Sequence, residues 1–318
     1  MRQSRSSHSS ARSSAVAKAG TAPTTSRRVK LLGKHPIGIP FVAPYVAFLI
    51  VVFAYPLGLA LYMSFHDYFF AAPGAIVERP FIGVDNYTQV LGDPVFRTAL
   101  FNVAKFVIIN VPLTVALALV LATALNRAIP WRTFFRASYY VPYVTASVAV
   151  VGIWLWLFAG NGLVNTILGP LAPDPPWLVN EAWALPVIAL LVTWKQLGFY
   201  VLLYLAAMQN VPNELYEAAK VDGAGAIRSF FAVTVPGVRA ATTLVVILAT
   251  IVGANFFTEP YLLTGGGGPN NSSISPVLMM YREGIEQGNA GYAAAIGVIL
   301  AIGVLAISLL NRYVLERD

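Results

Sequence analysis

The chain has 318 residues, of which 57% are hydrophobic and only 11% are charged. Soluble domains carry charge on about a quarter of their residues, so this composition excludes an ordinary soluble protein and indicates a membrane protein. The absence of cysteine excludes a disulfide framework, a thiolate zinc site and a cysteine nucleophile, and three scattered histidines argue against a metal centre, so no metal site is predicted.

The net charge of +7 originates in the N-terminal segment. Residues 1–40 contain eight basic side chains and no acidic one, whereas the remainder contains thirteen basic and fourteen acidic side chains. This segment is rich in Ser and Arg and poor in large apolar residues. We therefore expect a disordered basic tail over 1–40 that lies in the cytoplasm, contacts anionic lipid and binds no nucleic acid.

Six apolar stretches are long enough to cross a bilayer, which takes about 20 residues. They lie at about 41–62, 98–125, 135–158, 183–208, 238–258 and 291–310. The first is too long for a signal-peptide core and is expected to bend at Pro44 or Pro56. The last is rich in Gly and Ala, which is typical of closely packed membrane helices. The predicted fold is an all-α membrane protein with one six-span domain over 41–318.

The basic residues of the loops predict the orientation of these spans. They concentrate between spans two and three and between spans four and five, where the Arg and Lys side chains are Arg127, Arg132, Arg136, Lys220, Arg228 and Arg239. Loops rich in Lys and Arg remain in the cytoplasm. The pattern therefore predicts a multi-pass protein of the bacterial plasma membrane with both termini in the cytoplasm.

The second cytoplasmic loop, at about 212–236, has the pattern of two short helices. Asn213 is a plausible N-cap, and Gly223 is a natural stop at the end of the first helix. A second amphipathic helix is expected from Gly225 to Thr234, ending before Pro236. By itself this pattern also fits a connector lying on the bilayer surface.

The sequence of this loop resembles the EAA loop of ABC-importer permeases. Glu217-Ala218-Ala219 is followed, at the spacing of that family, by Asp222-Gly223-Ala224. The FIGVDNY, GLVN and LTGGGGP segments, at 81–87, 162–165 and 263–269, resemble further motifs of its carbohydrate-uptake branch, the maltose or glycerol-3-phosphate type. The last segment has one glycine more than the family motif.

The resemblance implies that the chain is the transmembrane permease of a binding-protein-dependent sugar importer and forms half of an alternating-access pathway. It implies that Glu217, Ala218, Ala219, Asp222, Gly223 and Ala224 couple the spans to a cytoplasmic ATPase. The implied partners are an ATPase dimer, a second permease and an extracytoplasmic sugar-binding protein. The chain has no Gly-x-x-x-x-Gly-Lys-Ser/Thr motif, so we expect no enzymatic activity and no bound cofactor, with ATP-Mg on the partner ATPase.

Lys195 is a candidate for the sugar pathway because ionisable groups inside spans are functional by default. Polar and aromatic residues of the fourth and fifth spans are further candidates, because sugars stack on aromatic faces and need polar partners for their hydroxyl groups. The set is Trp194, Lys195, Gln196, Tyr200, Asn255, Phe256, Glu259 and Tyr261. Alternative roles remain open: a structural pairing of Lys195 with a helix carbonyl or with an acid on another subunit, Asn255 as a bridge between helices and Tyr261 as an interfacial residue. Lys105 can reach outward to the interface.

Two other classes of function compete with this interpretation. An ion-coupled secondary transporter of a small polar solute would need a coupling acid within the spans, but the acids lie in loops or at span ends. A membrane-embedded enzyme would need a catalytic cluster at one membrane face, and the sequence shows none.

Overall fold

The computed structural model describes residues 38–72, 74, 77–126 and 130–315. By internal packing the chain divides into two units, 1–56 and 57–318, which are described separately. The described residues are mostly helical and form no β-sheet; an isolated bridge joins His66 and Phe81. The predicted basic tail lies outside the described residues up to position 37, and residues 38–40 already belong to the first helix.

The first unit is helical wherever the structure describes it. Helix α2 (Gly38–Leu49) continues through a π-helical turn, η1 (Ile50–Ala54), into α3 (Tyr55–Ser64). Prolines stand inside both α-helices, at Pro44 and Pro56. The wider turn immediately before Pro56 fits the loss of a hydrogen bond at a proline and the room that its ring needs. The expected bend stays a prediction.

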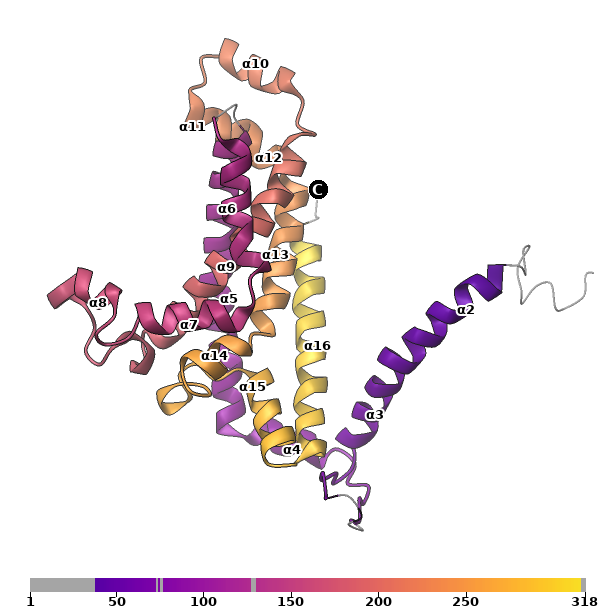
Figure 1. Ribbon diagram of the computed structural model, residues 1–318. Coiled ribbons are helices and arrows are strands. Elements are labelled where there is room, and N and C mark those ends of the chain that lie inside the picture. The colour runs from indigo at the N-terminus through magenta and orange to yellow at the C-terminus, as the bar shows by residue number, and fades with distance from the viewer. Residues whose placement is uncertain (1–37, 73, 75–76, 127–129, 316–318) are drawn as a thin grey trace, which may run out of the picture. The chain divides into compact units, whose positions relative to one another are not determined.

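The second unit begins within α3 and consists of packed helices (Figure 1). Its remaining α-helices are α4 (Asp85–Gly92), α5 (Pro94–Asn126), α6 (Arg132–Val144), α7 (Ser147–Leu157), α8 (Leu163–Leu168), α9 (Ala184–Met208), α10 (Asn213–Val221), α11 (Ala226–Ser229), α12 (Val235–Gly237), α13 (Arg239–Ala254), α14 (Thr258–Leu263), α15 (Pro276–Tyr281) and α16 (Ala290–Leu315). Short 3-10 turns occur at η2 (Gly169–Leu171), η3 (Trp177–Val179) and η5 (Pro269–Asn271), and π-helical turns at η4 (Phe230–Thr234) and η6 (Arg282–Glu286).

Within the described residues, four helices are long and apolar enough to cross a membrane, or up to six if each of two bent pairs is one span. The single helix expected over 135–158 is wrong: α6 and α7 meet at 97°. Thr145 and Ala146 take extended backbone angles between them, and the Thr145 hydroxyl donates to the Val141 carbonyl at 2.7 Å. The second bent pair turns by 72° between Gly237 and Arg239.

Helix α9 is the central element of the second unit. It is apolar nearly all round and largely buried, as expected for a helix enclosed by others. Helix α5 packs along it, and the Asn110 amide donates to the Thr193 hydroxyl at 2.7 Å across the contact. Helix α6 approaches at Gly198, where a Cβ atom would lie 2.1 Å from the Tyr139 carbonyl oxygen. The approach of α6 to α9 therefore requires glycine at this position.

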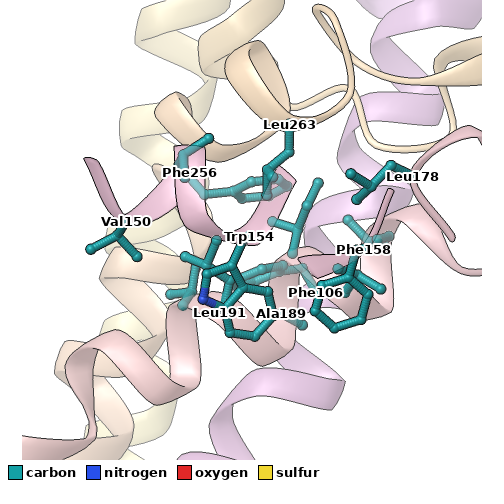
Figure 2. Close-up of a cluster of buried hydrophobic side chains, with 14 of the residues drawn as sticks. Phe106, Val150, Trp154, Phe158, Leu178, Ala189, Leu191, Phe256 and Leu263 are labelled. Carbon is teal, nitrogen blue, oxygen red and sulfur yellow. The ribbon is translucent and has the colours of Figure 1, made fainter. Parts of the chain in front are cut away.

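A cluster of buried apolar side chains lies where α5, α7, α9 and α14 meet (Figure 2). The rings of Phe106 and Phe256 stack with centroids 4.4 Å apart, and Trp154 stacks on Phe158 at 5.0 Å. Offset stacking adds to the free energy gained by burying these rings. The cluster holds the segment after α13 against α5 and α9.

The loop at 212–236 and helix α4 lie at opposite ends of the second unit, and α16 runs between these ends (Figure 1). At the α4 end, the Tyr292 hydroxyl donates to Asp93 at 2.8 Å. Gly291 is buried there, and a Cβ atom on it would lie 2.3 Å from the His66 carbonyl oxygen. Ala295, one turn further, is completely buried. The close packing predicted from the small residues of this helix is confirmed at its beginning.

Candidate functional site

Helix α10 ends in a glycine-capped turn. Gly223 has φ +74°, a conformation that residues with a Cβ rarely adopt. The Ala224 N–H donates to the Ala219 carbonyl at 2.8 Å and the Gly223 N–H to the Lys220 carbonyl at 3.0 Å. This pair of bonds is the Schellman arrangement, so the predicted stop at Gly223 is confirmed. It reverses the chain from α10 into α11.

The predicted N-cap at Asn213 and the predicted helix end before Pro236 are both wrong. Helix α10 begins at Asn213 itself, with Pro212 at the N-cap position and no capping hydrogen bond from either side chain. The second helix does not end before Pro236: it runs from Ala226 to Gly237 through the π-helical turn η4. A proline in the last turn is tolerated because the wider preceding turn makes room for its ring.

One face of α10 is fastened to the rest of the second unit. Tyr216 and Ala219, three residues apart and therefore on one face, pack against the buried cluster that includes Val211 and Val233. The Tyr216 and Thr234 hydroxyl oxygens lie 3.1 Å apart, within hydrogen-bonding distance. Helix α10 is thus attached to the helix that runs from Ala226 to Gly237.

The opposite face of the loop is open. Glu217, Ala218 and Asp222 are exposed, Gly223 is exposed, and Ala224 is half-buried. Large apolar side chains are exposed beside them, with Val221 at 87% and Ile227 at 76% of full accessibility. Apolar side chains so placed, among charged ones, are typical of a surface that contacts another protein.

A second feature is a recess between α9, α13 and α14, which we call the polar recess. Its volume is about 260 Å³. It is lined by Val192, Gln196, Val252, Asn255, Phe256, Phe257, Thr258 and Glu259. The structure therefore brings together four of the eight residues predicted for the sugar pathway: Gln196, Asn255, Phe256 and Glu259.

The polar side chains of the recess are held in different ways. The Gln196 carbonyl oxygen accepts from the Tyr200 hydroxyl at 3.0 Å, so the buried Tyr200 orients Gln196 without lining the recess. The Asn255 amide nitrogen donates to the Ile251 carbonyl at 2.7 Å, one turn back in its own helix. The alternative of Asn255 as a bridge between helices is therefore not what the structure shows.

The remaining predicted pathway residues lie outside the recess lining. Trp194 is 43% exposed and its ring packs near Trp154. The Lys195 ammonium donates to the Ser147 hydroxyl at the beginning of α7. Tyr261 stacks on Phe257 with centroids 5.4 Å apart. The pairing of Lys195 with Ser147 was not predicted, because nothing in the sequence relates two residues 48 positions apart.

The glycine-rich segment after α14 forms a tight turn. Gly265 to Gly268 all have positive φ. The N–H groups of Gly266 and Gly267 donate to the Pro260 carbonyl, and that of Gly268 to the Thr264 carbonyl. Because these donors are used within the chain, they are not available to hold a phosphate group. The segment is a structural turn.

The family model described as "Binding-protein-dependent transport system inner membrane component" matches residues 114–317. The chain belongs to this family. The arabinooligosaccharides transport system permease protein AraP of Bacillus subtilis (strain 168) is 35% identical over 276 residues, or 85% of this chain and 86% of the relative. The diacetylchitobiose uptake system permease protein NgcF of Streptomyces coelicolor is 32% identical over 288 residues, or 86% of this chain and 79% of the relative.

The fold of this family member also matches solved structures. A bacterial ABC transporter involved in the import of the acidic polysaccharide alginate contains a chain that superposes with a TM-score of 0.74. The match covers 92% of this chain and 99% of the other at 21% sequence identity. The chain therefore shares the helical fold of that transporter chain, and its family membership and apolar helices make it a multi-pass membrane component of a transport system.

Proposed function

We propose that the chain is the transmembrane permease subunit of an ATP-driven, binding-protein-dependent sugar importer. The observation that carries the proposal is the family membership, together with relatives matched over most of their length whose names specify oligosaccharide transport. The permease forms half of the translocation pathway and works by alternating access. It performs no covalent chemistry and binds no cofactor, and ATP-Mg is bound by a separate ATPase subunit.

The 212–236 loop is the ATPase-coupling element in this proposal. Glu217, Ala218, Ala219, Asp222, Gly223 and Ala224 form the segment that couples the spans to the ATPase. The small, exposed side chain of Ala218 lets the helix seat closely in a cleft, whereas Ala219 holds the opposite face of α10 against the second unit. One face of α10 is exposed and the other is attached to the second unit. This arrangement supports the role, because a coupling helix must contact the ATPase on one side and the spans on the other.

The proposed domain is a six-span unit over 41–318, preceded by a basic cytoplasmic tail over 1–40, with each bent helix pair counted as one span. Both chain termini lie in the cytoplasm of a bacterial cell. Within the described residues, acids outnumber basic residues in the segments at the α4 end, where Asp67, Asp85, Asp93 and Glu283 gather. Basic side chains are retained on the cytoplasmic side, which supports placing the α10 end in the cytoplasm.

The partners in this proposal are a second permease, an ATPase dimer and an extracytoplasmic sugar-binding protein. The sugar moves beside α9, α13 and α14, where the polar recess supplies polar groups and aromatic rings. Lys195, Trp194, Tyr200 and Tyr261 support this path from outside the recess lining. Carbohydrates are bound in this manner because hydroxyl groups need hydrogen-bond partners when they leave water.

The decisive experiment is uptake of labelled arabinotriose into proteoliposomes containing the full complex, with the binding protein added outside. We expect uptake that requires internal ATP and continues when an uncoupler collapses ion gradients. The permease alone should show no ATP hydrolysis. Uptake driven by an ion gradient without ATP would replace this function with secondary transport, and robust hydrolysis by the permease alone would contradict the assignment of roles.

A further inference from the structure

Glu259 is a buried acid with no partner in the described residues. It is 8% exposed, and it lines the polar recess. The structure records no hydrogen bond or ion pair for its carboxylate within the part of the chain that it describes. A carboxylate that is largely removed from water and has no partner is costly to maintain. An unpartnered carboxylate at the edge of a cavity therefore indicates a role in binding a ligand that enters the cavity.

The position of Glu259 lowers part of this cost without supplying a partner. It stands in the first turn of α14, where free backbone N–H groups favour an acid. The lining contains no basic side chain. The recess therefore presents an acceptor group that neither the backbone nor a neighbouring cation neutralises by direct contact.

The polar side chains of the recess, including Glu259, differ in their numbers of hydrogen-bond donors and acceptors. A carboxylate accepts hydrogen bonds through two oxygen atoms and donates none. One N–H of the Asn255 amide donates to the Ile251 carbonyl, which leaves the side-chain oxygen as an acceptor and the second N–H as a donor. Gln196 has its oxygen engaged with Tyr200, which leaves its amide nitrogen as a donor. The Thr258 hydroxyl can both donate and accept. Because the carboxylate adds two oxygens that only accept, the recess offers more acceptor positions than donors and matches a ligand that donates.

A saccharide supplies donors of the required kind. Two hydroxyl groups on neighbouring ring carbons can each donate to one oxygen of a single carboxylate, and a third can accept from Gln196. The apolar remainder of the lining, including Phe256 and Phe257, suits the C–H face of a sugar ring. The volume of about 260 Å³ is near the lower limit for small-molecule pockets, about 300 Å³, and suits one sugar residue rather than a whole oligosaccharide.

We propose that Glu259 accepts hydrogen bonds from two neighbouring hydroxyl groups of the transported saccharide and makes the polar recess selective for electroneutral saccharides over anionic ones. This inference rests on the proposed function. A sugar carboxylate, sulfonate or phosphate brings only acceptor oxygens and a negative charge to a recess that already holds an acid. In a poorly solvated site, two like charges a few ångström apart repel each other strongly.

The test measures saccharide binding directly on the assembled transporter in lipid nanodiscs without the binding protein, which would otherwise select the sugar first. The probes are arabinotriose, which is neutral, and galacturonic acid trimer, which is anionic. Affinities are taken from calorimetric titration for the wild type, Glu259→Gln and Glu259→Asp. Glu286→Gln is the matched control, because it removes the same charge from an exposed acid at the end of η6, which does not line the polar recess.

We expect the wild type to bind arabinotriose and to reject the uronate. Glu259→Gln should weaken arabinotriose binding by about tenfold, because hydrogen bonds to a charged group are lost, and should bring the two affinities closer together. Glu259→Asp should weaken binding but keep the preference for the neutral sugar, since the charge remains. Glu286→Gln should match the wild type.

Three results would overturn the inference. An unchanged ratio of affinities in Glu259→Gln would show that the acid does not select charge. Failure of Glu259→Gln and Glu259→Asp to co-purify with the other subunits would show that Glu259 faces a neighbouring subunit and serves assembly. Absence of binding of both probes to the wild type, together with absence of ATP-dependent uptake, would instead contradict the proposed function itself.

Discussion

The hydroxyl oxygens of Tyr216 and Thr234 lie 3.1 Å apart and join α10 to the helix that returns from it. Thr234 is buried and belongs to the π-helical turn η4, which leads through α12 directly into α13. The base of α13 is therefore joined to α10 through a short, packed connection, by which a displacement of α10 would reach it. The other end of α13 reaches Asn255 and the polar recess.

The link between Tyr216 and Thr234 should affect coupling more than assembly. Tyr216→Phe and Thr234→Val each remove one hydroxyl group, and a hydrogen bond of this kind contributes about 0.5–1.5 kcal/mol. We expect uptake to fall by about two- to tenfold while the ATPase still co-purifies. The double variant should be no worse than the poorer single variant, because both remove the same bond. Fully additive losses would show that the two hydroxyls act separately.

The conformation of Gly223 should make it intolerant of a side chain. A Cβ atom at its φ of +74° costs about 1–2 kcal/mol, and no atom lies near enough to clash. Gly223→Val should therefore misplace α10 and reduce both ATPase pull-down and uptake. Gly225→Val is the control, because Gly225 is extended, with φ −70° and ψ 174°, and has equal space around it. Equal behaviour of the two variants would contradict a coupling role for this turn.

The contact of α6 with α9 at Gly198 should tolerate no added methyl group. In Gly198→Ala the new atom would lie 2.1 Å from the Tyr139 carbonyl oxygen, so one helix must move. Overpacking of this kind costs about 1–3 kcal/mol. We expect a lower temperature of thermal unfolding in detergent. Gly152→Ala is the control, because a Cβ atom there meets nothing within 4 Å; a similar loss in both would point to general helix effects.

Asn255 lines the polar recess, whereas Trp194 does not. Substitutions at these two positions should therefore have different effects on uptake. Asn255→Leu removes a polar group from the recess and should lower uptake and raise the half-saturating sugar concentration by about tenfold, with normal complex assembly. Trp194→Ala should lower uptake less. If Trp194→Ala has the larger effect, the pathway runs past the exposed Trp194 face instead of the recess.

The sequence by itself was sufficient for the helical class, for four of the predicted spans and for the stop at Gly223. These follow from local causes: a long apolar run favours a helix wherever it packs, and glycine alone adopts positive φ without strain. The family motif from Glu217 to Ala224 could also be recognised in the sequence, because its residues are neighbours in the chain.

Only the tertiary structure decided which candidate residues meet. The polar recess joins Gln196 of α9 to Asn255 and Glu259, which are about 60 positions further along the chain, and Lys195 faces Ser147 rather than the recess. The 97° break between α6 and α7 was equally hidden, since the apolar run continues through it. Hydropathy records how much a residue avoids water, whereas these features depend on which helix packs against which, and that is set by contacts between segments distant in sequence.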